Sequence, residues 1–281
     1  MVAPQRVTSM GTAQPALRRR LEQHLDELPV LPTVIAELMQ LREDSPRYFE
    51  DVRKLIDREP TFTTRLLAAA NSAASAPRKP IASVRDALSW VGSKRAANVL
   101  LAAAVTRVFV PRDPWEKGLW RHSLEVAILS RALARHRGLD PELAYTCGLL
   151  HDIGRFLLFQ EAADQLRQIE QTPWRSADEL LTAERRICGA THAELGAQAC
   201  RKWRLPEQIA EMVANHHVPS RAEDAVTPIV ACADMTMFAS MRAAPGGPIE
   251  PCRETADVGL DAVVEAARAE AEATVRALGV S

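Results

Sequence analysis

The sequence predicts an all-α protein. Glycine occurs only 12 times and tyrosine and phenylalanine only 2 and 6 times, which argues against an all-β sandwich. Apolar residues recur at spacings of three and four along most of the chain, as in Leu17, Leu21, Leu25 and Leu28. The first half contains no convincing run with the two-residue period of a strand.

The first group of predicted helices ends at Val110. Pro60 separates the third helix from the fourth, Ser83 is an N-cap for the fifth, and Gly92 ends the fifth. We expect helices over 16–28, 34–41, around 52–56, over 61–70, over 84–91 and from 93 to about 110.

A second group of helices follows the segment VPRDP (110–114), whose two prolines and aspartate interrupt the pattern. Thr191 is a predicted N-cap, and Pro141 and Pro206 stand where helices begin. We expect helices over 115–136, 141 to about 154, 178–188, 193–203, 206 to 216 or 217, and 227–241.

These patterns predict a domain organisation. It comprises a disordered tail (1–15), an N-terminal helical lobe (16–110), a second helical lobe (111–243), a linker (244–257) and a C-terminal amphipathic helix (258–279). We expect the last helix to pack on the body, with dimerisation through it as the alternative.

Charge and cysteine usage exclude several classes of protein. The net charge of −1 over 281 residues gives no global basic footprint for nucleic acid or anionic lipid, which leaves only a local basic patch as an alternative. The five cysteines form no CxxC pair, which predicts buried thiols in a reducing compartment, without disulfides or a zinc ribbon. The start of the chain lacks a signal-peptide pattern, and the longest apolar stretch, 96–110, is interrupted by Arg107. We therefore expect a cytoplasmic protein that does not enter a membrane.

Histidine and aspartate residues at predicted helix ends are the candidate functional residues. Neutral imidazoles and carboxylates are ligands of borderline and hard divalent metals. A single histidine at a helix end is usually a cap or core residue, whereas Asp234 lies inside an apolar helix, where an unpaired carboxylate is costly. The candidates are His122, His151, Asp152, His192, His216, His217 and Asp234.

The order of His122, His151-Asp152 and Asp234 resembles the H…HD…D signature of the HD superfamily of metal-dependent phosphohydrolases. His192 and His216-His217 are similar to the extended ligand set of its HD-GYP branch. Over residues 25–242 the chain most resembles the HDOD domain, the HD-related output domain of bacterial signalling proteins. The motifs that carry this resemblance are LPVLP (28–32), IDREP (56–60), AANSA (69–73), SVRDALSWVG (83–92), LWRHSLEVA (119–127), GLLHDIGR (148–155), HAELGAQ (192–198), WRLPEQI (203–209) and ANHHVP (214–219).

The resemblance implies a helical fold with an N-terminal lobe and an HD-type lobe, and a site for one or two divalent ions such as iron, manganese or zinc. Asp152 would bridge two metals, and Arg155 would neutralise phosphate charge in an active enzyme. On this family pattern His122, His151 and Asp234 would bind one ion, and His192, His216 and His217 the other.

Three departures from the pattern of HD-GYP enzymes count against hydrolysis of cyclic di-GMP. Arg155 stands where lysine is expected, Val218-Pro219 follows the histidine pair without a GYP segment, and Gly118 replaces a glutamate one turn before His122. We therefore expect a signalling module that binds proteins, or a nucleotide ligand, without turnover. The alternatives are a metal-dependent phosphohydrolase and a purely structural metal site.

Two further features have ordinary interpretations. Glu184 lies two turns before His192 and could orient that ligand, but we favour a solvated charge beside Arg185. Asn71 and Ser72 are interpreted as a helix C-terminus and turn.

Overall fold

The structure is a computed structural model that describes residues 13–42, 44–72, 75–172, 174, 176–242, 252–255 and 257–278. Within these residues the regular elements are helices and no strand occurs, which confirms the all-α prediction. The predicted tail and the predicted linker lie mostly outside the described residues. The α-helices are α1 (Ala13–Glu27), α2 (Thr33–Gln40), α3 (Tyr48–Asp57), α4 (Pro60–Ala70), α5 (Val84–Val91), α6 (Ser93–Val108), α7 (Pro114–His136), α8 (Pro141–Leu150), α9 (Ile153–Glu170), α10 (Ala177–Cys188), α11 (His192–Lys202), α12 (Glu207–Asn215), α13 (Val226–Arg242) and α14 (Leu260–Leu278), with 3-10 turns η1 (Pro219–Arg221) and η2 (Arg253–Thr255).

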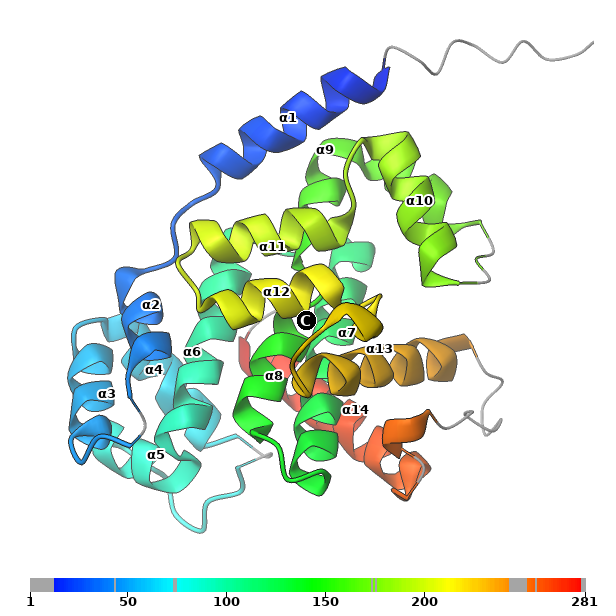
Figure 1. The fold of residues 1–281 in the computed structure, drawn as a ribbon. Helices are drawn as coiled ribbons and strands as arrows, with labels where there is room; N and C mark the ends of the chain where they lie inside the picture. The colour runs from blue at the N-terminus through cyan, green and yellow to red at the C-terminus, as the bar shows by residue number, and fades with distance from the viewer. Residues whose placement is uncertain are drawn as a thin grey trace, which may run out of the picture.

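Helices α2 to α5 surround one side of α6 and form a group at one end of the molecule (Figure 1). The side chains at their shared interior are apolar and almost fully buried, for example Ile35, Ile56, Phe62, Leu66 and Leu100. The predicted N-cap of α5 is confirmed, because the Ser83 hydroxyl accepts a hydrogen bond from the Asp86 backbone N–H at 3.0 Å. Asn71 follows α4, as predicted, and exchanges two hydrogen bonds of 2.8 Å with the backbone of Ile81, which closes the connection to α5.

The long helix α7 is the centre of the second group. It packs against α8, α13 and α14, while α11 packs against α9 and α12. A capping box between Asp113 and Glu116 starts α7, and Pro114 occupies its first turn. Helix α1 lies apart from α2 to α6 and packs on α9 and α10 (Figure 1).

The chain turns sharply between α8 and α9. The sequence pattern predicted one helix from residue 141 to about 154, but α8 ends at Leu150 and α9 begins at Ile153. Asp152, between them, has φ −101° and ψ 13°, outside the helical region, and helix α9 through Glu170 was not predicted. This turn places His151 and Asp152 side by side in the interior.

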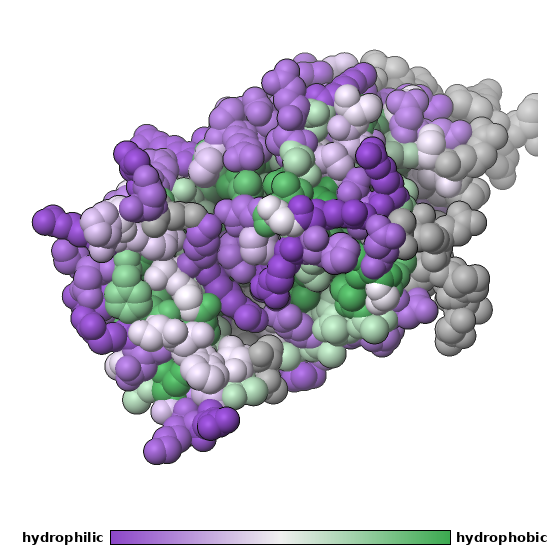
Figure 2. All heavy atoms as spheres, turned by 60° about the horizontal axis from the view of Figure 1, so that its bottom comes forward, coloured by the Kyte–Doolittle hydropathy of each residue, from purple (hydrophilic) through white to green (hydrophobic). Residues whose placement is uncertain are grey.

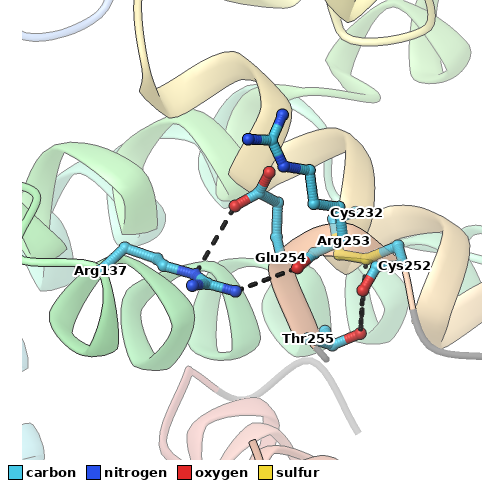
Figure 3. Close-up of a disulfide and its surroundings, with 6 residues drawn as sticks. All are labelled: Arg137, Cys232, Cys252, Arg253, Glu254 and Thr255. Carbon is cyan, nitrogen blue, oxygen red and sulfur yellow. Dashed lines mark hydrogen bonds and ion pairs between the residues drawn. A yellow bond between two sulfur atoms is a disulfide. The ribbon is translucent and has the colours of Figure 1, made fainter. Parts of the chain in front are cut away.

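Cys232 on α13 forms a disulfide with Cys252, whose Cα atom lies 6.2 Å away (Figure 3). The prediction of five free thiols is therefore wrong for these two residues, because η2 packs against α13 and brings Cys252 to it. Arg137 from the end of α7 supports the same turn by donating a hydrogen bond of 3.0 Å to the Arg253 carbonyl (Figure 3). Cys147, Cys188 and Cys200 are free and buried, as predicted.

The face of the molecule drawn in Figure 2 carries both hydrophilic and hydrophobic side chains. On the face at the bottom of Figure 1, hydrophilic residues break the apolar ones into separate areas (Figure 2). No helix among the described residues is long and apolar enough to cross a membrane.

Candidate metal centre

Seven histidine and aspartate side chains from six helical elements meet in the second group of helices. His151 and Asp152 come from the turn between α8 and α9, and His192 is the first residue of α11. A capping box between Thr191 and Glu194 fixes the start of α11 and thus the position of His192. The other four are His122 on α7, His216 and His217 at the end of α12, and Asp234 on α13.

The first cluster lies around Asp234. Its Oδ1 atom is 3.0 Å from His122 Nε2 and 3.6 Å from His151 Nε2. Asp152 closes the cluster, with Oδ2 3.5 Å from His151 Nε2. Ligand atoms of His122, His151 and Asp152 all lie within 4.8 Å of one another, a separation compatible with one cation.

The second cluster lies around the other oxygen atom of Asp152. Oδ1 is 3.3 Å from His192 Nε2 and 3.9 Å from His216 Nε2. His192 Nε2 is also 3.0 Å from His217 Nε2 and 3.3 Å from His216 Nε2. Asp152 thus belongs to both clusters, one carboxylate oxygen facing each.

Hydrogen bonds on the far side of three imidazoles orient them toward these clusters. His151 Nδ1 donates to the Gly148 carbonyl at 2.8 Å, and His216 Nδ1 donates to the Val213 carbonyl at 2.7 Å. His192 Nδ1 donates to Glu184, whose carboxylate oxygens are 2.7 and 2.8 Å away. With Nδ1 engaged in this way, Nε2 is the atom of each ring that faces the cluster, as in metal-bound histidines. Burial would lower the pKa of His151, but Asp152 and Asp234 outweigh burial and raise it to about 10, so a cation at His151 Nε2 would displace a proton.

Glu184 corrects an expectation from the sequence. The favoured interpretation was a solvated charge, but this side chain is fully buried and bound to His192. Burial alone would raise the pKa of Glu184, and the His192 contact outweighs burial and lowers the pKa below its usual value. The spacing of eight residues to His192 was the only sequence signal for this role.

Burial and neighbouring charges shift the titration of the candidate ligands in different directions. Burial lowers the pKa of His217 to about 4, with His192 adding to the effect, and lowers that of His216 well below the ordinary value. Burial disfavours the Asp152 carboxylate, yet His151 and Arg155 outweigh it and hold its pKa well below the usual range. Near neutral pH, His216 and His217 are therefore neutral ligands beside ionised carboxylates.

Unsatisfied polar atoms show that the cluster fits a cation. His151 Nε2 and Asp152 Oδ1 are buried and have no hydrogen-bond partner. Buried polar groups of this kind are uncommon in folded proteins, and a metal ion is one way to satisfy them. A set of imidazole nitrogens and carboxylate oxygens suits iron, manganese or zinc.

Arg155 lies next to the centre but is held by acidic side chains. Its guanidinium forms a close ion pair with Glu170 at the end of α9, and its Nε is 3.7 Å from Asp152 Oδ2. Trp115 donates a hydrogen bond of 2.5 Å to the second oxygen of Glu170. The role of Glu170 was not predicted, because the sequence analysis assigned no helix to this part of the chain.

A family model of the HDOD domain matches residues 28–219, more than half of the chain. The chain belongs to the HDOD domain family.

The fold of this HDOD protein is similar to that of an HDOD domain protein with unknown function from Geobacter sulfurreducens, with 24% identity, a TM-score of 0.67 and 94% of each chain covered. A protein from Shewanella amazonensis SB2B, provisionally named a phosphohydrolase, gives 24% identity and a TM-score of 0.68 over 96% of this chain and 98% of the other. A protein from Marinobacter aquaeolei VT8, provisionally named a signal transduction protein, gives 20% identity and a TM-score of 0.69 over 97% of this chain and 67% of the other. At these identities the likeness shows a shared fold.

Curated relatives of the HDOD chain are longer proteins. An uncharacterised protein from Treponema pallidum is 26% identical over 251 residues, which are 84% of this chain and 47% of that protein. Ribonuclease Y from Thermus thermophilus is 29% identical over 123 residues, 44% of this chain and 17% of the enzyme. The HDOD chain thus spans less than half the length of these relatives.

Proposed function

We propose that this HDOD protein is a signal-transduction module that holds a divalent-metal centre and acts by binding a protein partner or a nucleotide ligand without turnover. The single observation that most supports a metal centre is the position of the Asp152 carboxylate. One of its oxygen atoms faces one group of histidines, and the other oxygen atom faces the second group. Six further side chains surround it, so one or two ions of iron, manganese or zinc have enough ligands.

The residues around the centre would bind and orient. Asp152 and Asp234 supply negative charge to offset a dication, and His192, His216 and His217 supply imidazole nitrogen ligands. The hydrogen bonds from Nδ1 of His151, His192 and His216 hold these rings in position before a cation arrives. A bound divalent cation would supply Lewis acidity and join α8, α11 and α12 at one point.

The surroundings of Arg155 support the absence of turnover. The guanidinium is engaged by Glu170 and lies beside Asp152, so its charge is largely neutralised within the protein. A phosphate group would have to compete with these carboxylates for the Arg155 guanidinium.

A second candidate function is metal-dependent phosphohydrolysis. It is favoured by the accessibility of one edge of the centre, since the His122 and Asp234 side chains are 11% and 15% exposed while His151, His192 and His216 are fully enclosed. Water and a phosphate ester could approach from this edge, with Asp152 between two ions.

The first experiment is elemental analysis of protein purified without a polyhistidine tag. We expect one or two equivalents of iron, manganese or zinc, lost in the His151→Ala Asp152→Ala double variant. A matched control is His136→Ala Asp164→Ala, which changes the same residue types at exposed positions. Absence of metal from the parent protein after growth with each metal would overturn the proposed centre.

Hydrolysis of bis-p-nitrophenyl phosphate by the loaded protein separates the two functions. The signalling module predicts no turnover above the His151→Ala Asp152→Ala background. Robust, chelator-sensitive hydrolysis that disappears in Asp152→Ala would overturn the proposal of a module without turnover and establish the second candidate.

A further inference from the structure

A cavity with arginine-rich walls lies between the two groups of helices, away from the metal centre. Its walls come from α4, α5, α6, α7, α8 and α14, and its volume is about 50 Å³. A site that holds a water needs roughly 10–15 Å³ on this measure, so the cavity has room for a few waters or one tetrahedral oxyanion. The charged residues on its walls are Arg65, Arg95, Arg131 and Glu270.

Glu270 on α14 connects two of these arginines through one oxygen atom. Its Oε1 accepts a hydrogen bond of 2.8 Å from Arg95 on α6 and one of 2.6 Å from Arg131 on α7. The two guanidinium groups therefore lie next to each other, and they repel unless an anion stays between them. Arg131 is mostly buried, with its side chain 9% exposed and its guanidinium 5.0 Å from the centroid of the Tyr145 ring.

Arginines outnumber carboxylates on the walls of the cavity. Arg65 from α4 adds a third cation to the walls, against Glu270 as the single carboxylate among the lining residues. The next carboxylate, Glu142, lies behind the wall residue Asn98 and accepts a hydrogen bond of 2.9 Å from its amide. The walls thus bring three guanidinium groups to one space with Glu270, and Glu142 lies behind Asn98.

We propose that this cavity binds a phosphate group, as free phosphate or as a phosphate monoester, and that Glu270 is the internal anion that the phosphate displaces. Guanidinium groups match phosphate oxygens in pairs and are less strongly hydrated than ammonium groups. Three such groups from α4, α6 and α7 surround a space of the size of one oxyanion. Binding would replace the contact between α14 and α6, so occupancy of the cavity would change how α14 is held.

Isothermal titration of the full chain with inorganic phosphate tests the site. The protein is first treated with a chelator and kept at constant ionic strength, so that phosphate cannot bind through a metal ion. Glu270→Gln keeps the shape of the side chain and removes the competing charge. We expect it to bind phosphate about tenfold tighter than the parent, and Arg95→Gln to bind at least tenfold more weakly than the parent.

Glu272→Gln is the matched control, because Glu272 also joins α14 to α7, through an exposed contact with Arg121 at 3.4 Å. We expect its phosphate affinity to equal that of the parent. Adenosine monophosphate in place of phosphate identifies the source: tighter binding than phosphate supports a monoester, and binding of phosphate alone supports the free anion. Equal affinities of Glu270→Gln and Glu272→Gln, or no binding to Glu270→Gln, would overturn the proposal. Because chelated protein is used, these results do not depend on the metal centre.

Discussion

The carboxylate of Glu184 holds His192 at two points, accepting a hydrogen bond of 2.9 Å from its backbone N–H and one of 2.7 Å from its ring Nδ1. Both side chains are fully buried. The carboxylate therefore fixes the ring tautomer that leaves Nε2 directed at Asp152, and it does so from α10, outside the ligand set.

Glu184→Gln should weaken metal binding while the fold is retained. Glutamine can keep one hydrogen bond but lacks the carboxylate charge, and a loss of such a partner costs roughly 10–100-fold in metal affinity. Competition titration with a chromogenic chelator measures the change. Glu211→Gln, at an exposed position of α12, is the control and should bind metal like the parent. Equal affinities of the two variants would show that Glu184 does not support the centre.

Gly154 should tolerate no side chain, because α9 and α11 touch there. A Cβ atom at this position would lie 1.9 Å from the His192 carbonyl oxygen and 2.7 Å from the Gly196 nitrogen. We expect Gly154→Ala to lower the free energy of unfolding by at least about 2 kcal/mol, since backbone atoms must move apart. Urea unfolding followed by circular dichroism measures the change.

Gly118 provides the opposite case on α7. A Cβ atom there meets nothing within 4 Å, and the residue is inside a helix. Gly118→Ala should therefore stabilise the protein by up to about 1 kcal/mol, the difference in helix propensity. A destabilised Gly118→Ala protein, or a Gly154→Ala protein as stable as the parent, would contradict the described packing.

The disulfide should stabilise the region that joins α13 to η2. Cys232 and Cys252 are 20 residues apart, and closing a loop of that length stabilises the folded state by about 3 kcal/mol in the chain-entropy model. Urea unfolding with and without a phosphine reductant should show a loss of this size in the parent. The free energy of unfolding of the Cys232→Ala Cys252→Ala variant should not change with the reductant. If the free energy of unfolding of the parent does not change either, the disulfide does not form.

Local signals made most helices predictable from the sequence, whereas the convergence of the candidate metal ligands depended on tertiary contacts. Ser83 and Thr191 cap their helices as predicted, because a cap is decided by residues three positions apart. The ligand types were also visible, since histidine and aspartate at helix ends are chemically distinctive. Spacing alone could not show that Asp152 faces both clusters, because that depends on how α8, α11 and α12 pack. Only the resemblance to the HD superfamily implied a bridging Asp152.

The wrong predictions have the same cause. Glu184 looked like a solvated helix-face charge because it stands beside Arg185 in the sequence. Its contact with His192 depends on the tertiary structure that brings the two residues together. The pairing of Cys232 with Cys252 likewise follows from the position of η2 against α13. Helix α9 was missed because the apolar run of α8 continues across the turn at His151 and Asp152.

The three buried thiols should make the protein less stable in alkali. Burial raises the pKa of Cys188 and of Cys200 to about 12, and raises the pKa of Cys147 well above its usual value. The unfolded chain releases these protons near pH 8.5, so it binds fewer protons than the folded protein above that pH. The stability conferred by the neutral thiols is complete below about pH 8.5 and declines as the pH rises from there toward 12, by up to about 1.4 kcal/mol per pH unit for each thiol.

Urea unfolding of the Cys232→Ala Cys252→Ala variant at pH 7, 9 and 10 measures this slope. Adding Cys200→Ala should lower stability at pH 7 through the lost packing, yet make the decline between pH 9 and 10 shallower. An unchanged slope would show that this thiol ionises as readily in the folded protein as in the unfolded chain.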